Sequence, residues 1–330
     1  MSDRSASHSA RRRTRAFWRA ARLGLVLAVL LAAPVSSPPQ TVAALPRAFT
    51  FRGGVEVIRV SLSVTDGRQR LVRGLAEGDF AIYEDGVRQE VAYFSPEPLP
   101  LSVSLLIDGS SSMGRADKLP VARRAASRIV EMLHPDDVAQ VVQFDDRITV
   151  LQDFTSDRAA LQEALRATRA AGSTGLRNAL YVSLKQLRRQ GGPEAPRRRA
   201  IVLLSDGVDT TSLVDEDQVL ELARQADVGI YVVTLLTVSQ FERERTLDKA
   251  SYFLGTLARV SGGEAFYPRT LSELDSIYER VAEELRAQYT LGYVSRNERP
   301  DGRWRQILVR TPSRAKLQLR HKAGYYAIPG

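Results

Sequence analysis

Five oxygen-bearing side chains stand where they could hold a metal ion. Asp108, Ser110 and Ser112 follow directly after a long apolar run and precede a helical pattern. Thr174 lies in a Gly-Ser-Thr-Gly stretch that opens another helix, and Asp206 follows a second apolar run. Carboxylate and hydroxyl oxygens are hard ligands, which suit Mg²⁺, Mn²⁺ or Ca²⁺ and suit Zn²⁺ or copper poorly. The pattern therefore indicates a divalent-cation site, with Mg²⁺ as the expected ion.

The stretch from Asp108 to Ser112 is, on its own, equally typical of a polar turn that caps a helix. Thr174 and Asp206, in the right order and each at the end of an element, favour a metal site over a simple turn. If the carboxylates act partly through water, five side chains leave an octahedral ion unsaturated. We then expect one exchangeable position for a partner's oxygen. Asp209 lies just beyond and is expected to be a solvated loop acid.

The elements that would position these residues alternate between strand and helix over residues 101–288. Near-continuous apolar runs are typical of strands covered on both faces, and repeated β-α units imply a mostly parallel sheet. In that architecture ligands sit at the carboxyl ends of the strands, where the five donors lie. The expected strands are 101–107, 138–144, 148–151, 200–204, 230–235 and 264–267. The expected helices are 118–133, a short one at 161–165, 176–187, 219–226, 247–260 and 271–285.

Short strand patterns flank this region on both sides. Runs near 58–64, 80–84 and 89–94 are separated by Asp-Gly turns, and a proline-rich linker follows them. Three further runs lie at 289–294, 304–310 and 317–320. Neither group is large enough to stand alone, so we expect them to pair into one β-sandwich-like module with the α/β domain inserted. The expected division is a leader over 1–44, β segments over 45–97 and 289–330, and an α/β domain over 101–288.

The net charge of +9 is concentrated in the leader. Up to Arg22 the chain carries seven arginines and one aspartate, so a basic nucleic-acid-binding face is not expected. The apolar run Leu23 to Ala33 and small residues near Ala44 are typical of a secretory signal, because a membrane span needs about 20 apolar residues. We expect an exported protein, periplasmic, at the cell surface or secreted. An uncleaved leader is the alternative, and it would be the only membrane contact.

Catalytic patterns are absent from the sequence. No serine lies in Gly-x-Ser-x-Gly, the phosphate-binding loop pattern is missing, and the three histidines (His8, His134 and His321) suggest no triad. The chain has no cysteine, which excludes disulfides, thiolate ligands and a lipoprotein anchor. We therefore expect a protein that is not an enzyme. Arg197, Arg198 and Arg199 are expected to lie in a solvated loop, with an anion-reading patch as the alternative.

The five donors, taken together, resemble the metal-ion-dependent adhesion site of von Willebrand factor type A domains. The order of elements over 101–288 is similar to that fold, which implies a doubly wound, Rossmann-like domain. The resemblance implies that the three hydroxyls contact the metal, that the two aspartates act directly or through water, and that a ligand carboxylate completes the shell. The contacting residues would be Ser110, Ser112 and Thr174, with Asp108 and Asp206 as the aspartates.

The flanking segments sharpen the resemblance. Residues 74–86 and 288–326 look like those around the A domain in a bacterial VWFA-related family of exported proteins, for which no reaction or partner is implied. The expected function is adhesion-type binding of an acidic group on a protein or glycan partner through the cation. One alternative is an assembly or regulatory subunit that recruits another protein machine through its A domain. A metal-dependent hydrolase is the least favoured, because no general base is visible near the donors.

Overall fold

The long apolar runs form the central strands of a six-stranded sheet. The computed structural model describes residues 57–190, 196–206, 209–235 and 245–327. The strands lie in the order β10-β9-β8-β5-β6-β7, and β7 at one edge is antiparallel to β6 while the other pairs are parallel. This arrangement confirms the expected α/β fold class. The strands are β5 (Leu101–Asp108), β6 (Val138–Phe144), β7 (Ile148–Thr155), β8 (Arg198–Ser205), β9 (Gly229–Thr234) and β10 (Ala265–Phe266).

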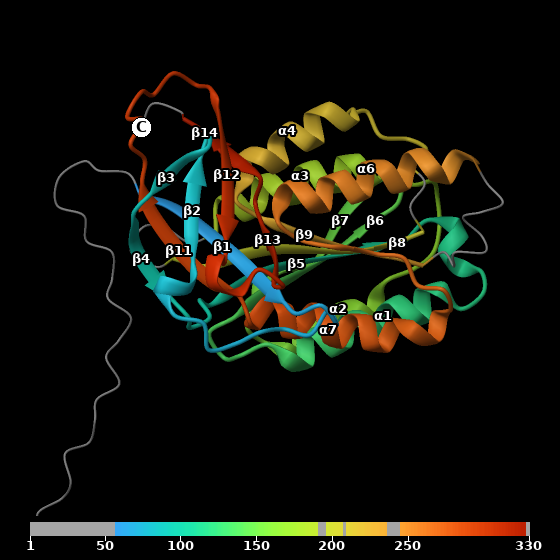
Figure 1. The fold of residues 1–330 in the computed structure, drawn as a ribbon. Coiled ribbons are helices and arrows are strands. Elements are labelled where there is room, and N and C mark those ends of the chain that lie inside the picture. Colours follow the sequence, from blue (N-terminus) through green and yellow to red (C-terminus); the bar gives the residue numbers. More distant parts are fainter. Residues whose placement is uncertain (1–56, 191–195, 207–208, 236–244, 328–330) are drawn as a thin grey trace, which may run out of the picture. The chain divides into compact units, whose positions relative to one another are not determined.

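Helices cover both faces of this sheet. Every residue of β5 is buried, and alternate residues of a strand face opposite sides. Val103 and Leu105 pack with α1, α2 and α7, whereas Leu106 packs with α3, α4 and α6. Figure 1 shows the two sets of helices on opposite sides of the strands. Their bounds are α1 (Lys118–Met132), α2 (Arg158–Ala167), α3 (Leu176–Arg188), α4 (Glu216–Ala226), α6 (Arg245–Ser261) and α7 (Leu274–Arg286).

The flanking segments pair with each other into two four-stranded antiparallel sheets, here called the β module. One has the order β13-β1-β11-β4 and the other β14-β12-β2-β3. The central strand β1 lies between β11 and β13, and buried Val60, Leu62, Leu291 and Ile307 share one apolar cluster. The expected β-sandwich-like module is confirmed. Its strands are β1 (Val57–Thr65), β2 (Ala81–Glu84), β3 (Val87–Gln89), β4 (Val91–Ser95), β11 (Tyr289–Val294), β12 (Trp304–Arg310), β13 (Gln318–His321) and β14 (Gly324–Tyr326).

One expected strand is divided in the structure. The run 89–94 was expected as a single strand, but β3 ends at Gln89 and β4 begins at Val91 in the other sheet. The physical reason is that the chain passes from one sheet to the other at the exposed Glu90. Residues before it form hydrogen bonds with β2, and residues after it form hydrogen bonds with β11. Four short 3₁₀ turns complete the described elements: η1 (Glu77–Asp79), η2 (Ser111–Gly114), η3 (Leu271–Glu273) and η4 (Pro312–Arg314).

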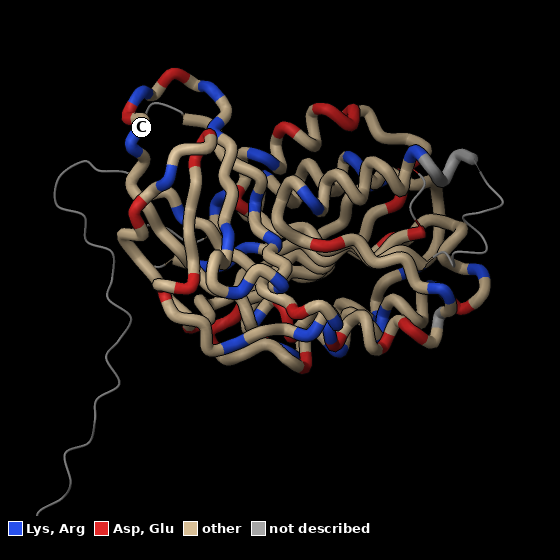
Figure 2. The backbone as a smooth tube through the Cα atoms, in the orientation of Figure 1, with Lys and Arg blue, Asp and Glu red and all other residues tan. Residues whose placement is uncertain are grey.

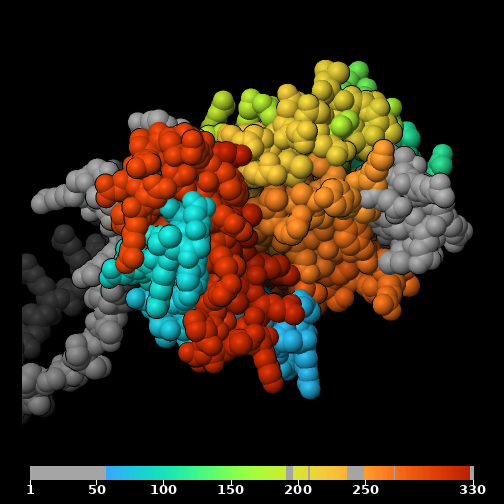
Figure 3. All heavy atoms as spheres, turned by 45° about the horizontal axis from the view of Figure 1, so that its top comes forward, coloured from blue at the N-terminus to red at the C-terminus, as the bar shows by residue number. Residues whose placement is uncertain are grey.

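The β module contacts the α/β part through buried polar groups and through α4. The Glu284 carboxylate of α7 accepts a hydrogen bond from Ser63 Oγ at 2.7 Å and one from Tyr231 OH at 3.2 Å, and it also pairs with Arg320. Tyr326 OH donates to Glu221 of α4 at 2.7 Å. In the space-filling view of Figure 3 the C-terminal strands, in red, lie directly against α4, in yellow.

The expected leader over 1–44, and the start of the N-terminal β segment up to residue 56, lie outside the described residues. Among the helices that the structure does describe, none combines the length and apolar character needed to cross a bilayer. Figure 2 shows that Lys and Arg positions and Asp and Glu positions are both scattered over the described backbone.

Candidate metal centre at the carboxyl edge of the sheet

Asp108 is the last residue of β5 and is completely buried. Its Oδ1 accepts a hydrogen bond from Ser110 N at 2.8 Å, and its Oδ2 accepts one from Ser205 Oγ at 2.5 Å. Both carboxylate oxygens are therefore held in a fixed orientation, one by the turn after β5 and the other by the last residue of β8. The chain turns at once after this residue, and only glycine fits next, because a Cβ on Gly109 would lie 2.8 Å from Arg169 O.

The hydroxyls of Ser110 and Ser112 lie side by side in the turn that follows. Their Oγ atoms are 3.0 Å apart and share a hydrogen bond, and the buried Met113 anchors the turn in the core. Ser110 is the N-cap of η2, yet its side chain makes no capping hydrogen bond. A spacing of about 3.0 Å is also what two adjacent ligands of an octahedral Mg²⁺ would show, because each lies about 2.1 Å from the ion. The turn thus places two hydroxyls at a ligand spacing and does not use the first as a helix cap.

The loop that carries Thr174 is fixed to the loops on either side. Ser111 N donates to Gly172 O at 3.0 Å, which joins it to the Asp108 turn. Thr174 N donates to Thr210 Oγ1 at 3.0 Å, and Thr210 N donates to Thr174 O at 2.9 Å, which joins it to the loop after β8. Thr174 is itself buried. The three sequence segments that hold the expected ligands therefore meet at one edge of the sheet.

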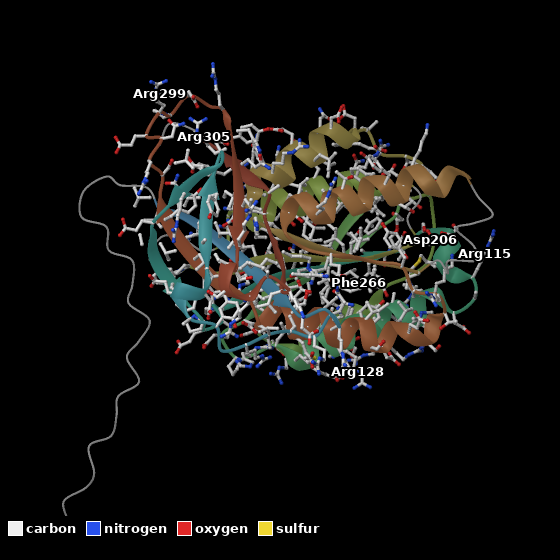
Figure 4. The ribbon with its side chains drawn as sticks, viewed as in Figure 1. Arg115, Arg128, Asp206, Phe266, Arg299 and Arg305 are labelled. Atoms are coloured by element: carbon white, nitrogen blue, oxygen red, sulfur yellow. The ribbon has the colours of Figure 1, made fainter. Side chains whose placement is uncertain are left out.

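Asp206 immediately follows β8 and forms an ion pair that was not expected from the sequence. Lys118 Nζ lies 2.9 Å from Asp206 Oδ2, with the two side chains 10% and 8% exposed. Lys118 is the first residue of α1, where the helix dipole disfavours a cation. A lysine at a helix start is at most a weak signal in the sequence, because neither its burial nor its partner can be read there. In Figure 4 Asp206 lies near Arg115 at the end of the sheet away from Arg299 and Arg305 of the β module.

The two carboxylates influence each other electrostatically. Burial, reinforced by the negative charge of Asp206, raises the pKa of Asp108 from 3.8 to about 6, although hydrogen bonds from Ser205 and Ser110 oppose the rise. A cation bound between the carboxylates would remove this repulsion. Two carboxylates, three hydroxyls and an oxygen spacing of 3.0 Å fit a hard divalent ion. Among the described residues no group of three or more His, Cys, Asp or Glu is placed to hold a metal, so the fit depends on the hydroxyls.

Asp209 is not the solvated loop acid that the sequence suggested. Its carboxylate accepts hydrogen bonds from Arg177 N at 2.7 Å and from Ser212 Oγ at 2.6 Å. Although burial opposes it, the hydrogen bonds from Ser212 and Arg177 hold the pKa of Asp209 below its ordinary value. Since Arg177 lies in the first turn of α3, Asp209 ties that helix start to the loop after β8. Its role is to position the Thr174 loop.

A family model matches the segment that carries the site. Residues 103–208, which include all five expected ligands, match the family model of the von Willebrand factor type A domain. UPF0353 proteins of Mycobacterium marinum and Mycobacterium tuberculosis are 26% identical to the chain over 200 residues, which cover 56% of this chain and 60% of each relative. The chain therefore spans about 60% of the length of these curated relatives.

Solved structures of similar fold share less sequence. An aerotolerance-related membrane protein from Bacteroides fragilis is 17% identical with a TM-score of 0.43, covering 56% of this chain and 98% of that one. Proximal thread matrix protein 1 from the mussel byssus, with a zinc-occupied MIDAS motif, is 18% identical with a TM-score of 0.45. That similarity covers 61% of this chain and 49% of the mussel protein.

Proposed function

We propose that this chain is an exported binding protein that holds a divalent cation, Mg²⁺ first, and grips an acidic group of a partner through it. The observation that carries the proposal is the pair of adjacent hydroxyls, 3.0 Å apart and free of helix capping, beside the buried carboxylate of Asp108. The partner is a protein or a glycan that offers a carboxylate. The proposed ligands are Asp108, Ser110, Ser112, Thr174 and Asp206.

Each group has a distinct part in the proposed binding. Ser110, Ser112 and Thr174 supply neutral oxygens to the ion, and the two aspartates balance its charge directly or through water. The bound cation supplies a positive centre with an open coordination position, which attracts a carboxylate. Because three of the five ligands are neutral, the metal keeps enough positive charge to bind an external anion.

A binding role is favoured over hydrolysis by the engagement of both carboxylates. The Asp108 oxygens accept hydrogen bonds from Ser110 and Ser205, and Asp206 pairs with Lys118. In the proposed arrangement both carboxylates bind the cation, directly or through water, so neither is left to act as a general base on a metal-bound water. We therefore propose that the protein acts without catalysing a reaction.

Thermal unfolding tests the metal site. Mg²⁺ at about 100 times its dissociation constant should stabilise the folded protein by about 2.7 kcal/mol relative to EDTA, because it binds the folded state alone. The gain should disappear in Asp108→Ala and persist in Asp153→Ala, which removes an exposed acid on β7. If Mg²⁺ raises the midpoint equally in wild type and Asp108→Ala, the metal binds elsewhere and the proposed site is wrong.

Glutarate, a small dicarboxylate, tests the second step of the proposal. Calorimetric titration should show that glutarate binds with Mg²⁺ present and not in EDTA, and by linkage glutarate should tighten Mg²⁺ binding by the same factor. Equal glutarate binding in EDTA would exclude the metal as the bridge. Export is tested separately, by fractionating cells that make the chain with and without residues 1–44. Equal recovery of both forms outside the cytoplasm would remove the leader from the proposal.

A further inference from the structure

A second, strongly basic site lies at the opposite end of the parallel strands. A cavity of about 40 Å³ lies between the β module and the amino ends of β8 and β9. Five cationic residues and one acid, Asp227, line it, and Lys322 Nζ pairs with that acid at 2.9 Å. The cations are Arg59, Arg197, Arg198, Arg199 and Lys322. Figure 2 shows several Lys and Arg positions where the strands of the β module approach the α/β part.

Arg198 carries a buried positive charge with neutral partners. Its side chain is 5% exposed, so the expectation of a solvated loop for these arginines is wrong at this residue. The guanidinium donates to Leu285 O at 2.8 Å and to Gln288 O at 3.1 Å, both uncharged backbone acceptors. Burial lowers the pKa of Arg198 to about 10. A buried charge is costly unless a counter-charge lies beside it. The charge of Asp137 offsets part of this cost, but that carboxylate forms its ion pair with Arg286, so the Arg198 guanidinium still favours a bound anion.

Three buried donors around the cavity have no hydrogen-bond partner among the described residues. They are Arg198 Nε, Arg199 Nε and Thr290 Oγ1, and all three residues line the cavity. Buried donors in proteins are nearly always satisfied, so three unsatisfied donors on residues that line one cavity favour a bound acceptor, although the Arg198 guanidinium reaches toward α7 and that of Arg199 toward α3 on the other face of the sheet. Burial disfavours the charge of Arg199, Asp227 partly offsets that cost, and Arg59 and Arg188 add repulsion.

We propose that this cavity binds a tetrahedral oxyanion, either a free phosphate or sulfate or the phosphate group of a monoester. The cavity has room for about three waters, and this space is comparable to that of one such anion. A neighbouring hollow of about 270 Å³ shares Arg59, Asp227 and Lys322 with the cavity and adds Arg224. The remainder of an ester would extend into this hollow. Arginine suits the role, because its planar guanidinium donates two parallel hydrogen bonds to phosphate oxygens.

The test uses inorganic phosphate and glycerol 3-phosphate as probes, with the full chain in EDTA so that the metal site does not contribute. Phosphate should raise the unfolding midpoint above that in sodium chloride of equal ionic strength. Thr290→Val keeps the side-chain shape and removes the unpartnered hydroxyl, and Arg59→Gln/Arg199→Gln removes two charges. Both variants should bind phosphate at least ten-fold more weakly in calorimetric titration. Arg128→Gln, an exposed arginine on α1, should bind it as the wild type does.

The outcomes separate the two sources of the anion. Comparable binding of glycerol 3-phosphate and phosphate assigns the site to phosphomonoesters, whereas binding of phosphate alone assigns it to the free anion. The proposal is overturned if phosphate and chloride act alike on the wild type, or if both variants retain the wild-type phosphate affinity. Thr290→Val also reports on folding. If the hydroxyl has no protein partner, the unfolding midpoint of this variant in sodium chloride should equal or exceed that of the wild type.

Discussion

At the scale of single residues, the candidate metal centre is governed by three charges in a buried space. Asp108 and Asp206 repel each other, and Lys118 is the positive charge that the chain itself supplies. A divalent cation would compete with that ammonium for Asp206. If the proposed site binds a metal, Lys118 would weaken that binding, because the ion would have to displace the ammonium from Asp206.

Lys118→Met should raise the affinity for Mg²⁺ about ten-fold or more, because a positive charge close to the metal is removed. The same change should destabilise the metal-free protein by about 3 kcal/mol, since Asp206 is left as an unpaired buried charge. Calorimetric titration gives the affinity, and urea unfolding in EDTA gives the stability. Lys185→Met, on the exposed side of α3, serves as the control. Weaker Mg²⁺ binding in Lys118→Met would mean that Lys118 orients Asp206 for the metal.

The raised pKa of Asp108 predicts a pH dependence. The folded protein holds this proton up to about pH 6, whereas the unfolded chain releases it near 3.8. The protonated Asp108 therefore contributes about 3 kcal/mol to the free energy of unfolding of the metal-free protein. This contribution is complete below about pH 4 and is lost as the pH rises through 6. Mg²⁺ needs the ionised carboxylate, so its stabilising effect should be small at about pH 5 and complete at about pH 7.5.

Unfolding in EDTA and in Mg²⁺ across this pH range measures both effects, with Asp108→Ala as the reference that lacks the titrating group. The difference between wild type and variant isolates this carboxyl from the other acids. A Mg²⁺ effect of constant size from pH 5 to 7.5 would contradict the assignment of Asp108 as a ligand that must lose its proton.

The position of the hydroxyls at the carboxyl edge of the sheet could be predicted from the sequence, because their spacing and the preceding buried strand are local features. Lys118 and Ser205 could not, because their contacts depend on how α1 and β8 meet across the sheet. Asp209 was misjudged for the same reason, since one of its hydrogen-bond partners, Arg177, lies 32 residues away at the start of α3.

At the scale of elements, α7 connects the two parts of the described structure. Its buried Glu284 accepts hydrogen bonds from Ser63 of β1 and Tyr231 of β9 and pairs with Arg320 of β13. One carboxylate thus joins a helix, a strand of the central sheet and two strands of the β module. The contact fixes the module against the amino side of the sheet, where the basic cavity lies.

Glu284→Ala should lower the free energy of unfolding by about 3 kcal/mol, because it leaves Arg320 without one of its carboxylate partners and two hydroxyls without an acceptor. Glu283→Ala, the exposed neighbour on the same helix, should change stability by no more than about 0.5 kcal/mol. Urea unfolding of both variants gives the comparison. Equal effects would show that the buried network contributes no more than a surface residue.

Most elements were predictable from periodicity, and the exceptions have a common cause. Strand β7 runs to Thr155, well past the expected residue 151, because its outer residues are half exposed at the sheet edge and carry a weak apolar pattern. The run 89–94 is divided because the chain changes sheets at Glu90, which alternation of side chains does not record. In both cases the pairing with another strand, and not the alternation of side chains, decides the bounds.

At the scale of the whole described chain, strands from both ends of the sequence close one module around the inserted α/β part. Such a module lacks a stable fold unless the inserted part is folded, so we expect the two parts to unfold together. Trp304 of β12 packs against Tyr326. Of the two tryptophans in the sequence, Trp304 lies within the described residues and Trp18 lies outside them. Its fluorescence reports on the module, whereas far-ultraviolet circular dichroism reports chiefly on the helices.

In a chain with Trp18 replaced by Phe, the two signals should give coincident thermal transitions. Loss of Trp304 fluorescence well below the helical transition would show that the module unfolds on its own and that the junction is weak. Glu284→Ala sharpens the comparison, because weakening the junction is the change most suited to separate the two transitions.

The insertion also has a mechanical consequence. Ser95 of β4 pairs with Thr290 of β11, so the two connections to the α/β part leave the module side by side. Asp108 lies at the far end of β5, about 23 Å along the strand from its start at Leu101. A pull between a partner at Asp108 and the module would run lengthwise along β5. It would load the hydrogen bonds to β6 and β8 in shear, all at once, instead of opening them one by one.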